Sequence, residues 1–401
     1  MSSSATMSST STAFAFIHTA DWQIGKAFGR FEADKAAVLR HARVEAIDRV
    51  AAAARSANAQ HVLVAGDVFD SEQVPDSLLG QTLARLAAHG PEAAGAGNGR
   101  ATAGLTWHLL PGNHDPARPG GIWERICAMG VPGSVVLHLD ALPAEIAPGV
   151  FLLPAPLRAK AMTGDPTAWM DAAPTPAHAL RIGLAHGSIK GFGSLGEAAV
   201  PIDPARPKSA GLAYMALGDW HGTKAIGPAL WYSGTPEPDS FSGNDPGNVL
   251  AVRLTGATSP PQVASVPSGR FTWANRKLIV AGASGLAPVE ADILRQGPAA
   301  ATYLLNLTLE GRVPLGAIPE IELRLGRLRA LLFDLQTDRD RLTAQATAED
   351  LADLGDGALA SVATRLKSRA ETATDDDQRV AMRALEKLVA LAAGSPAGRH
   401  P

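Results

Sequence analysis

The sequence is poor in cysteine, has no excess of basic residues and contains no long apolar run. Its single cysteine, Cys127, excludes internal disulfides and a cysteine-based zinc site, and we expect it to pack as a small apolar residue. The formal net charge is −3, so any contact with nucleic acid has to come from a local patch or from metal ions. Residues 1–12 are rich in Ser and Thr and lead into a strand too short for a signal peptide or a membrane span. We therefore predict a cytoplasmic protein with a disordered N-terminal tail and no membrane contact.

One pattern recurs along the first half of the chain. In residues 61–70, HVLVAGDVFD, a short β-branched run ends in Gly-Asp, which predicts a buried strand that delivers a carboxylate to a sheet edge. Apolar runs followed by Asp, Asn, His or Gln also occur in residues 14–23, 106–115, 182–187 and 215–222. Singly, each such residue is more often an ordinary loop residue than a ligand. Their recurrence at five strand ends indicates a shared site.

The order of elements predicts an α/β protein. Helical patterns over 32–57 and 75–89 separate the first three strands, so we expect these strands to be parallel, with their polar ends at one edge. Short strands separated by Pro and Gly predict a second, more antiparallel sheet packed on the first, at 134–139, 150–153, 180–185, 212–217, 229–232, 249–254 and 262–266. The pattern of elements changes near residue 268, where two further strands are predicted at 271–280 and 302–309. The remaining predictions are a mobile loop at 91–104 and helices at 288–296, 315–330, 358–370 and 375–393.

The polar strand ends provide the donors that a pair of divalent metal ions needs. A two-metal site requires a bridging carboxylate and oxygen or imidazole ligands around each ion. Asp21 and Gln23 are two positions apart and can face one ion, and Asp67 can bridge. Three further donors are the amide oxygen of Asn113 and the imidazoles of His186 and His221. The predicted site therefore draws on all five loops.

The motif order resembles the calcineurin-like metallophosphoesterase superfamily, whose pattern is D-x-H, G-D-x-x-D, G-N-H-D/E, a lone His and G-H-x-H. Within it, residues 18–22 (HTADW), 66–70 (GDVFD), 112–115 (GNHD) and 232–236 (YSGTP) are similar to the SbcD-type DNA repair exonuclease branch. The resemblance covers about residues 14–254. It implies a four-layer αββα sandwich of two mixed sheets with a smaller C-terminal capping region. The domains expected from it are a catalytic domain at 13–267, a capping domain at 268–346 and C-terminal helices at 347–401.

The resemblance also implies roles for individual residues. Asp21, Asp67 and His221 would hold one ion, and Asp67, Asn113 and His186 the other. His114 would be the catalytic histidine beside the scissile phosphate, with Asp115 as its orienting partner. His18, Arg118 and Lys190 are further candidates to approach the substrate, although a structural or surface role is at least as well supported for each.

Two positions depart from the family pattern. Gln23 stands where the family has the His of D-x-H, and Asp219 stands where it has the first His of G-H-x-H. If both ligate, each ion exchanges an imidazole for an oxygen, which favours Mn²⁺, or Mg²⁺, over Zn²⁺. The alternative is a site that has lost its metals, but the bridging Asp67 and the Gly-Asn-His triplet are intact, which favours a working enzyme.

Three functions follow from these observations. The first is a two-metal phosphodiesterase that acts on DNA ends as the nuclease subunit of a complex with an SbcC-like coiled-coil ATPase, with a homodimer as a further expected assembly. The second is a phosphoesterase of the same fold for a nucleotide or cyclic nucleotide. The third is a non-catalytic scaffold that binds a partner through its C-terminal helices. The region beyond residue 268 favours the first, and its modest Lys and Arg content argues against it.

Overall fold

A computed structural model describes residues 13–91, 104–189, 199–345 and 357–394. The predicted tail at 1–12, most of the predicted loop at 91–104, and Lys190 lie outside these residues. The chain divides into two compact units, one formed by 1–239 with 244–270 and the other by 240–243 with 271–401. Our domain boundaries at 267/268 and 346/347 stay predictions. No described helix is both long and apolar enough to cross a membrane.

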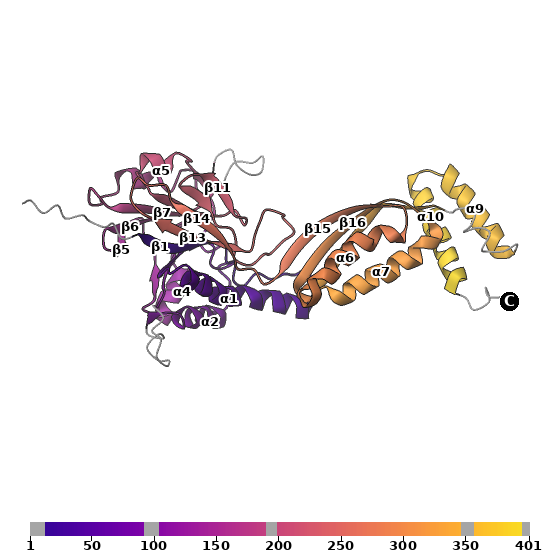
Figure 1. Cartoon of the computed structure of the whole chain (residues 1–401), viewed down its shortest axis with the longest axis horizontal. Coiled ribbons are helices and arrows are strands. Elements are labelled where there is room, and N and C mark those ends of the chain that lie inside the picture. The colour runs from indigo at the N-terminus through magenta and orange to yellow at the C-terminus, as the bar shows by residue number, and fades with distance from the viewer. Residues whose placement is uncertain (1–12, 92–103, 190–198, 346–356, 395–401) are drawn as a thin grey trace, which may run out of the picture. The chain divides into compact units, whose positions relative to one another are not determined.

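The first unit contains a six-stranded sheet whose centre is parallel (Figure 1). β1 lies between β2 and β13, with β2 and β3 parallel to it as predicted and β13 antiparallel. In sheet order the strands are β14 (Gln262–Pro267), β13 (Asn248–Leu254), β1 (Phe14–Thr19), β2 (His61–Val64), β3 (Thr106–Leu109) and β4 (Val135–Leu137). Three of the five apolar runs identified in the sequence, those at 14–23, 61–70 and 106–115, thus provide adjacent strands of this sheet.

Three helices pack on one face of this sheet, α1 (Ala33–Ser56), α2 (Asp76–Ala87) and α4 (Ile122–Met129). Their apolar sides form one core with alternate residues of the strands, such as Ile47 and Leu79 with Val62. Because α1 runs from the end of the first loop back along the sheet, it brings polar residues of its own close to the strand ends.

The second sheet of this unit differs from our prediction. Its central strands are parallel, and only the two edge strands are antiparallel to their neighbours. In sheet order the strands are β11 (Lys224–Gly227), β12 (Leu230–Tyr232), β10 (Tyr214–Gly218), β7 (Leu180–His186), β6 (Val150–Ala155) and β5 (Ala144–Ala147). The Pro- and Gly-rich connections resemble hairpin loops in sequence, but they cross over the sheet. The expected strands at 134–139, 249–254 and 262–266 belong to the first sheet.

The two sheets pack face to face through Phe16, Leu63 and Leu110 on one side and residues such as Ile182 and Tyr214 on the other. The mixed α/β fold with two large mixed sheets is therefore confirmed. Among the described residues, the outer face of the second sheet is covered by loops, the short helices η1 (Ala168–Ala172) and α5 (Arg206–Ser209), and the paired strands β8 (Ser188–Ile189) and β9 (Pro201–Ile202). The fourth layer is thus thinner than the family pattern implies.

A row of three imidazoles crosses adjacent strands of the first sheet. His61 Nδ1 lies 3.0 Å from His108 Nε2, and His108 Nδ1 lies 3.0 Å from His138 Nε2. Burial lowers the pKa of all three, that of His138 to about 4. These histidines are therefore neutral parts of the packing at ordinary pH.

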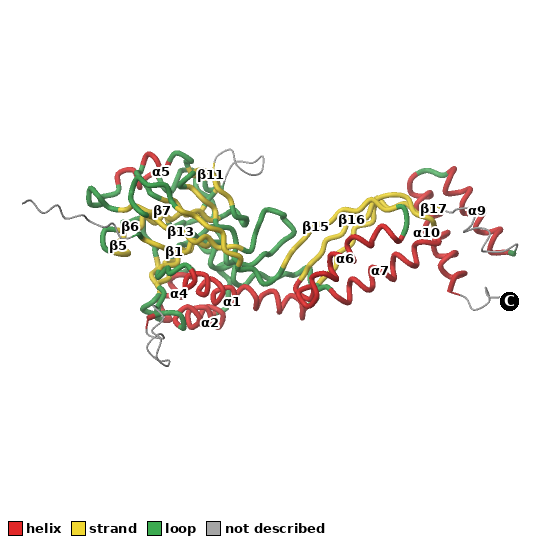
Figure 2. The backbone as a smooth tube through the Cα atoms, viewed as in Figure 1, coloured by secondary structure: helices red, strands yellow, loops and turns green. Residues whose placement is uncertain are grey.

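The second unit is a three-stranded parallel sheet, β15 (Thr272–Val280), β16 (Tyr303–Pro314) and β17 (Asp334–Gln345). Helices α6 (Ala287–Gln296) and α7 (Ile318–Leu331) accompany these strands (Figure 2) and share an apolar core with them. Short 3₁₀ turns lie at η2 (Ala283–Leu286), η3 (Gly297–Thr302) and η4 (Leu315–Ala317). Helices α9 (Ala358–Thr372) and α10 (Asp375–Gly394) follow.

The two strands and four helices predicted beyond residue 268 are confirmed. β17 was missed because nine of the twelve residues in DLQTDRDRLTAQ are polar or charged.

Candidate metal centre

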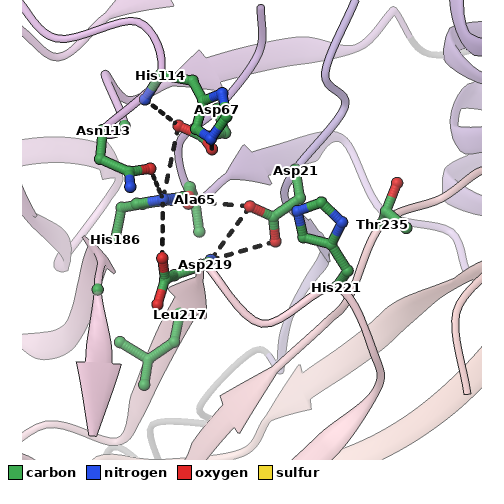
Figure 3. A network of polar contacts seen from close by, with 12 residues as sticks. Asp21, Ala65, Asp67, Asn113, His114, His186, Leu217, Asp219, His221 and Thr235 are labelled. Atoms are coloured by element: carbon green, nitrogen blue, oxygen red, sulfur yellow. Dashed lines mark hydrogen bonds and ion pairs between the residues drawn. The ribbon is translucent and has the colours of Figure 1, made fainter. Parts of the chain in front are cut away.

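Strand ends from both sheets of the first unit meet at one place (Figure 3). The loops after β1 and β2 bring Asp21 and Asp67, and β7 ends in His186. One ligand atom from each of these buried side chains lies within 4.8 Å of the others. The loop after β3 adds Asn113, and the loop after β10 adds Asp219. The sequence thus predicted residues that the fold brings together from five separate segments.

The backbone of the site adopts conformations that L-residues rarely take. Asp21, Gln23, Asp67 and Asp219 have φ angles of 54°, 47°, 52° and 105°. Each such residue costs of order 1–3 kcal/mol and persists only where neighbouring structure enforces it. Here the two loops hydrogen-bond to each other, with the Asp21 N–H donating to the Gly66 carbonyl at 3.1 Å and the Gln23 N–H to the Asp67 carbonyl at 3.0 Å. Paired loops therefore hold the side chains in a fixed arrangement.

Three side-chain oxygens converge around one ring nitrogen of His186. Its Nε2 lies 3.0 Å from Asn113 Oδ1, 3.5 Å from Asp67 Oδ1 and 3.9 Å from Asp219 Oδ1. The other nitrogen, Nδ1, contacts the Ala65 carbonyl at 2.9 Å, which orients the ring. An imidazole held by a backbone carbonyl, with its second nitrogen among oxygens, has the arrangement of a metal-ligating histidine.

The buried carboxylates of the cluster carry negative charge that a bound cation would neutralise. Burial alone would lower the pKa of His186, but the carboxylates of Asp67, Asp21 and Asp219 outweigh it and raise that pKa to about 9. Burial also raises the pKa of Asp21 to about 6, with nearby Asp67 and Asp219 adding to the effect. Buried carboxylates with only a proton to balance them form a set that a divalent ion can neutralise.

His221 completes the other side of the cluster. Burial would lower its pKa, but hydrogen bonding to Asp239 raises it, and the Nδ1 of His221 lies 3.1 Å from Asp239 Oδ2. Lys26 donates to the same oxygen at 2.7 Å. A carboxylate on Nδ1 fixes the ring and leaves Nε2 as the nitrogen that could bind a metal. Asp239 and Lys26 were missed by sequence reasoning, because nothing in their local sequence indicates that they meet His221.

Gln23 supplies an unmatched oxygen. Its side chain is 1% exposed, and its Nε2 donates to Asp67 Oδ2 at 2.7 Å. Its Oε1 is buried and has no hydrogen-bond partner among the described residues. An unsatisfied buried oxygen costs about 1–3 kcal/mol. A cation beside Asp67 would satisfy it, so the donors present fit a bound metal.

Asp219 lies between the two halves of the cluster. Its backbone N–H lies 3.1 Å from Asp21 Oδ1, and its Oδ2 accepts a hydrogen bond from the Ser188 hydroxyl. Its Oδ1 is the atom that approaches His186. Both departures from the family pattern, Gln23 and Asp219, therefore lie inside the cluster.

His114 stands at the open rim. Its ring nitrogen Nδ1 donates to the Asp70 carbonyl at 2.7 Å, and its backbone N–H donates to Asp67 Oδ1 at 2.9 Å. Its side chain is 47% exposed, and Nε2 lies 3.9 Å from Asp67 Oδ2. His114 is thus fixed beside the Asp67 carboxylate, with Nε2 at the exposed side of the ring.

Asp115 does not orient His114 as we predicted. Its carboxylate is buried and accepts hydrogen bonds from the Gly112 N–H at 2.7 Å and the Phe69 N–H at 3.0 Å. Burial raises its pKa well above the usual range, and Asp67 adds to that shift. Asp115 therefore links two site loops, and the Asp70 carbonyl orients His114. Sequence analysis could not find this contact, because any residue type can provide a backbone carbonyl acceptor.

The other residues noted near the substrate have structural partners. His18 is fully buried, with Nδ1 2.9 Å from the Tyr214 hydroxyl and Nε2 3.1 Å from the Leu217 carbonyl. Burial lowers its pKa to about 3. Arg118 is half-exposed and forms an ion pair with Glu72.

Two glycines allow the loops to approach. A Cβ on Gly112 would lie 2.1 Å from Asp67 Oδ1, and one on Gly218 would lie 2.0 Å from the Ala65 carbonyl oxygen. Neither distance is compatible with a side chain. The Gly of G-N-H-D and the Gly before Asp219 are therefore required by close packing around the ligands.

Residues 14–195 match the family described as calcineurin-like phosphoesterase. The matched region contains Asp21, Gln23, Asp67, Asn113, His114 and His186, whereas Asp219 and His221 lie beyond it. No curated protein matches the chain. The match supports the superfamily that the motifs indicate, and with it a hydrolase that acts on phosphoester bonds with the help of metal ions.

Proposed function

We propose that the protein is a two-metal phosphodiesterase that hydrolyses DNA. The observation that carries the proposal is the convergence of Asn113, Asp67 and Asp219 on His186 Nε2, in a cluster with Asp21 whose charge a metal would balance. Asp21, Gln23, Asp67 and His221 would hold one ion, and Asp67, Asn113, His186 and Asp219 the other. The metal ions, when bound, would activate water and neutralise charge on the phosphate.

The protein's own contribution is to place the phosphate and the leaving group. His114 presents Nε2 at the rim, while its Nδ1–H is held by the Asp70 carbonyl. A proton on Nε2 can pass to the leaving oxygen, the step in which a positioned acid contributes about 10²- to 10⁴-fold. The partial exposure of Asp219 and His221 favours a substrate that reaches the site from solvent, as a DNA backbone would.

We further propose an SbcC-like ATPase as the partner, docked on the C-terminal helices. Leu359 and Val362 on α9 are 49% and 44% exposed, and Val380 on α10 is 66% exposed. Apolar residues at this spacing on a helix suit a helical partner.

Purified protein is expected to hydrolyse linear duplex DNA and bis-p-nitrophenyl phosphate only when Mn²⁺ is added. His114→Ala should reduce the rate about 10²- to 10⁴-fold while metal binding is retained, because it removes the proton donor and no ligand. The exposed His178→Ala is the matched control and should leave the rate unchanged.

The outcomes separate the candidate functions. Hydrolysis of the small ester alone would favour a nucleotide-type phosphoesterase. No hydrolysis and no bound metal would indicate a scaffold.

The oxygen-rich ligand set is expected to select Mn²⁺ or Mg²⁺. Gln23→His restores the family imidazole and should raise the affinity for Zn²⁺ relative to Mn²⁺ by about tenfold or more, since imidazole suits softer ions. Competitive equilibrium dialysis measures this ratio directly. An unchanged ratio in both Gln23→His and Asp219→His would show that neither side chain is a ligand.

A further inference from the structure

Arg43 is the most deeply buried arginine among the described residues, and it contacts the Asp21 loop of the candidate metal centre. It lies on α1, is 1% exposed, and has no part in the family motifs. Removing a guanidinium from water is costly unless its hydrogen bonds and charge are compensated. Burial accordingly lowers its pKa, although surrounding carboxylates oppose that change. Its position therefore needs an explanation beyond packing.

The guanidinium bridges two loops. Nε donates to the Trp22 carbonyl at 2.7 Å and Nη2 to the Asp21 carbonyl at 3.0 Å. On the other side, Nη1 donates to the Glu237 carbonyl at 2.9 Å and Nη2 to the Thr235 hydroxyl at 3.0 Å. All four acceptors are uncharged oxygens, three of them backbone carbonyls and one a hydroxyl. None of these hydrogen bonds of Arg43 goes to a carboxylate.

Each of these loops fixes one side chain on the same side of the cluster. The first loop carries Asp21. Arg43 donates a hydrogen bond to the Asp21 carbonyl, in a stretch where both Asp21 and Gln23 have left-handed backbone conformations. The second carries Asp239, whose carboxylate contacts His221. The Thr235 hydroxyl also donates to the Glu237 carbonyl at 2.9 Å. This hydrogen bond closes the turn at 235–237, and both of its oxygens accept hydrogen bonds from Arg43.

We infer that Arg43 is a positioning residue that fixes Asp21 and His221 relative to each other. The inference rests on the proposed metal-dependent function and adds a residue that controls one of its two ions. A planar fork with five donors can reach acceptors in two loops at once, whereas a lysine ammonium cannot. The ion assigned to Asp67, Asn113, His186 and Asp219 takes no ligand from these two loops and no imidazole that Asp239 orients.

Mn²⁺ titration followed by electron paramagnetic resonance tests this role. Wild-type protein should bind two ions and show the signal of a spin-coupled pair. Arg43→Lys should weaken the ion at Asp21 and His221 by roughly 10- to 100-fold, the usual effect of losing support behind a ligand. At concentrations that saturate the wild type it should therefore show one isolated Mn²⁺. Arg43→Ala should behave alike, and added guanidinium ion at non-denaturing concentration should restore the pair.

Arg206→Met is the matched control. Arg206 is also buried, but it contacts Asp165 and Asp171, away from the cluster. Its loss should lower thermal stability and leave both ions bound. If Arg43→Lys and Arg43→Ala both bind two Mn²⁺ ions with the affinities of the wild type, the positioning role is overturned. A wild type that binds no Mn²⁺ would instead overturn the proposed function, and with it this inference.

Discussion

Asp67→Asn is expected to reduce hydrolysis by at least about 10³-fold, above the usual effect of losing one hydrogen-bond donor in an active site. The reason is that Asp67 is the proposed bridge between the ions, and a neutral amide cannot balance both. Titrated Mn²⁺ should no longer raise the thermal midpoint, because binding to the folded state is the source of that rise.

The same substitution should not unfold the protein. Asp67 raises the pKa of Asp115 and of Asp21, which means that its charge opposes theirs in the metal-free state. Asp67 also stabilises the protonated ring of His186, whose pKa it raises, so its removal has opposing effects and metal-free Asp67→Asn should remain folded. Asp140→Asn, at an exposed ion pair with Arg158, is the control and should change neither property. Substantial activity in Asp67→Asn would refute the site assignment.

Acid is expected to destabilise the first unit through its buried histidines. In the unfolded chain an imidazole takes up a proton near pH 6.5, whereas folding keeps His138 neutral down to about pH 4. The free energy of unfolding therefore falls as the pH drops below 6.5 and levels off below 4. For His138 the loss is about 3 kcal/mol, since each pKa unit corresponds to about 1.4 kcal/mol.

His138→Gln isolates this effect. It removes the titrating ring, whereas the metal-site carboxylates, whose raised pKa acts in the opposite direction, are present in both proteins and cancel in the comparison. Urea unfolding of the metal-free proteins, followed through the buried Trp107 and Trp123, should show the wild type losing about 3 kcal/mol more than the variant between pH 7 and pH 4. The exposed His178→Gln should track the wild type. Parallel pH curves for wild type and His138→Gln would contradict the prediction.

The sequence predicted the first sheet better than the second. Strands such as 61–64 are short, β-branched and followed by helical patterns, so their parallel pairing could be inferred. The second sheet was wrongly expected to be more antiparallel, because its crossovers contain little regular helix. Neither the place of β13 beside β1 nor the charged strand β17 has a local signal, since partner choice depends on packing between distant segments.

The site was predictable as a set of residue types and not as a set of contacts. Asp21, Asp67, Asn113, His186 and Asp219 are at strand ends, where periodicity alone points to a shared edge. Arg43, Asp239 and the Asp70 carbonyl could not be found in this way. Their roles arise from a helix, a distant loop and a backbone atom that only the folded chain places beside the ligands.

The pairing of β1 with β13 has a consequence for biosynthesis. β1 (Phe14–Thr19) precedes Asp21, yet one of its two neighbours in the sheet is Asn248–Leu254. His221 and Asp239 also arrive late in translation, after more than two hundred residues. A nascent chain that has just emerged through residue 195 contains the whole family match and still lacks one of the two sheet partners of its first strand. Contacts of such long sequence separation form slowly. The emerging protein therefore cannot bring together the full set of proposed ligands until nearly all of the first unit has left the ribosome.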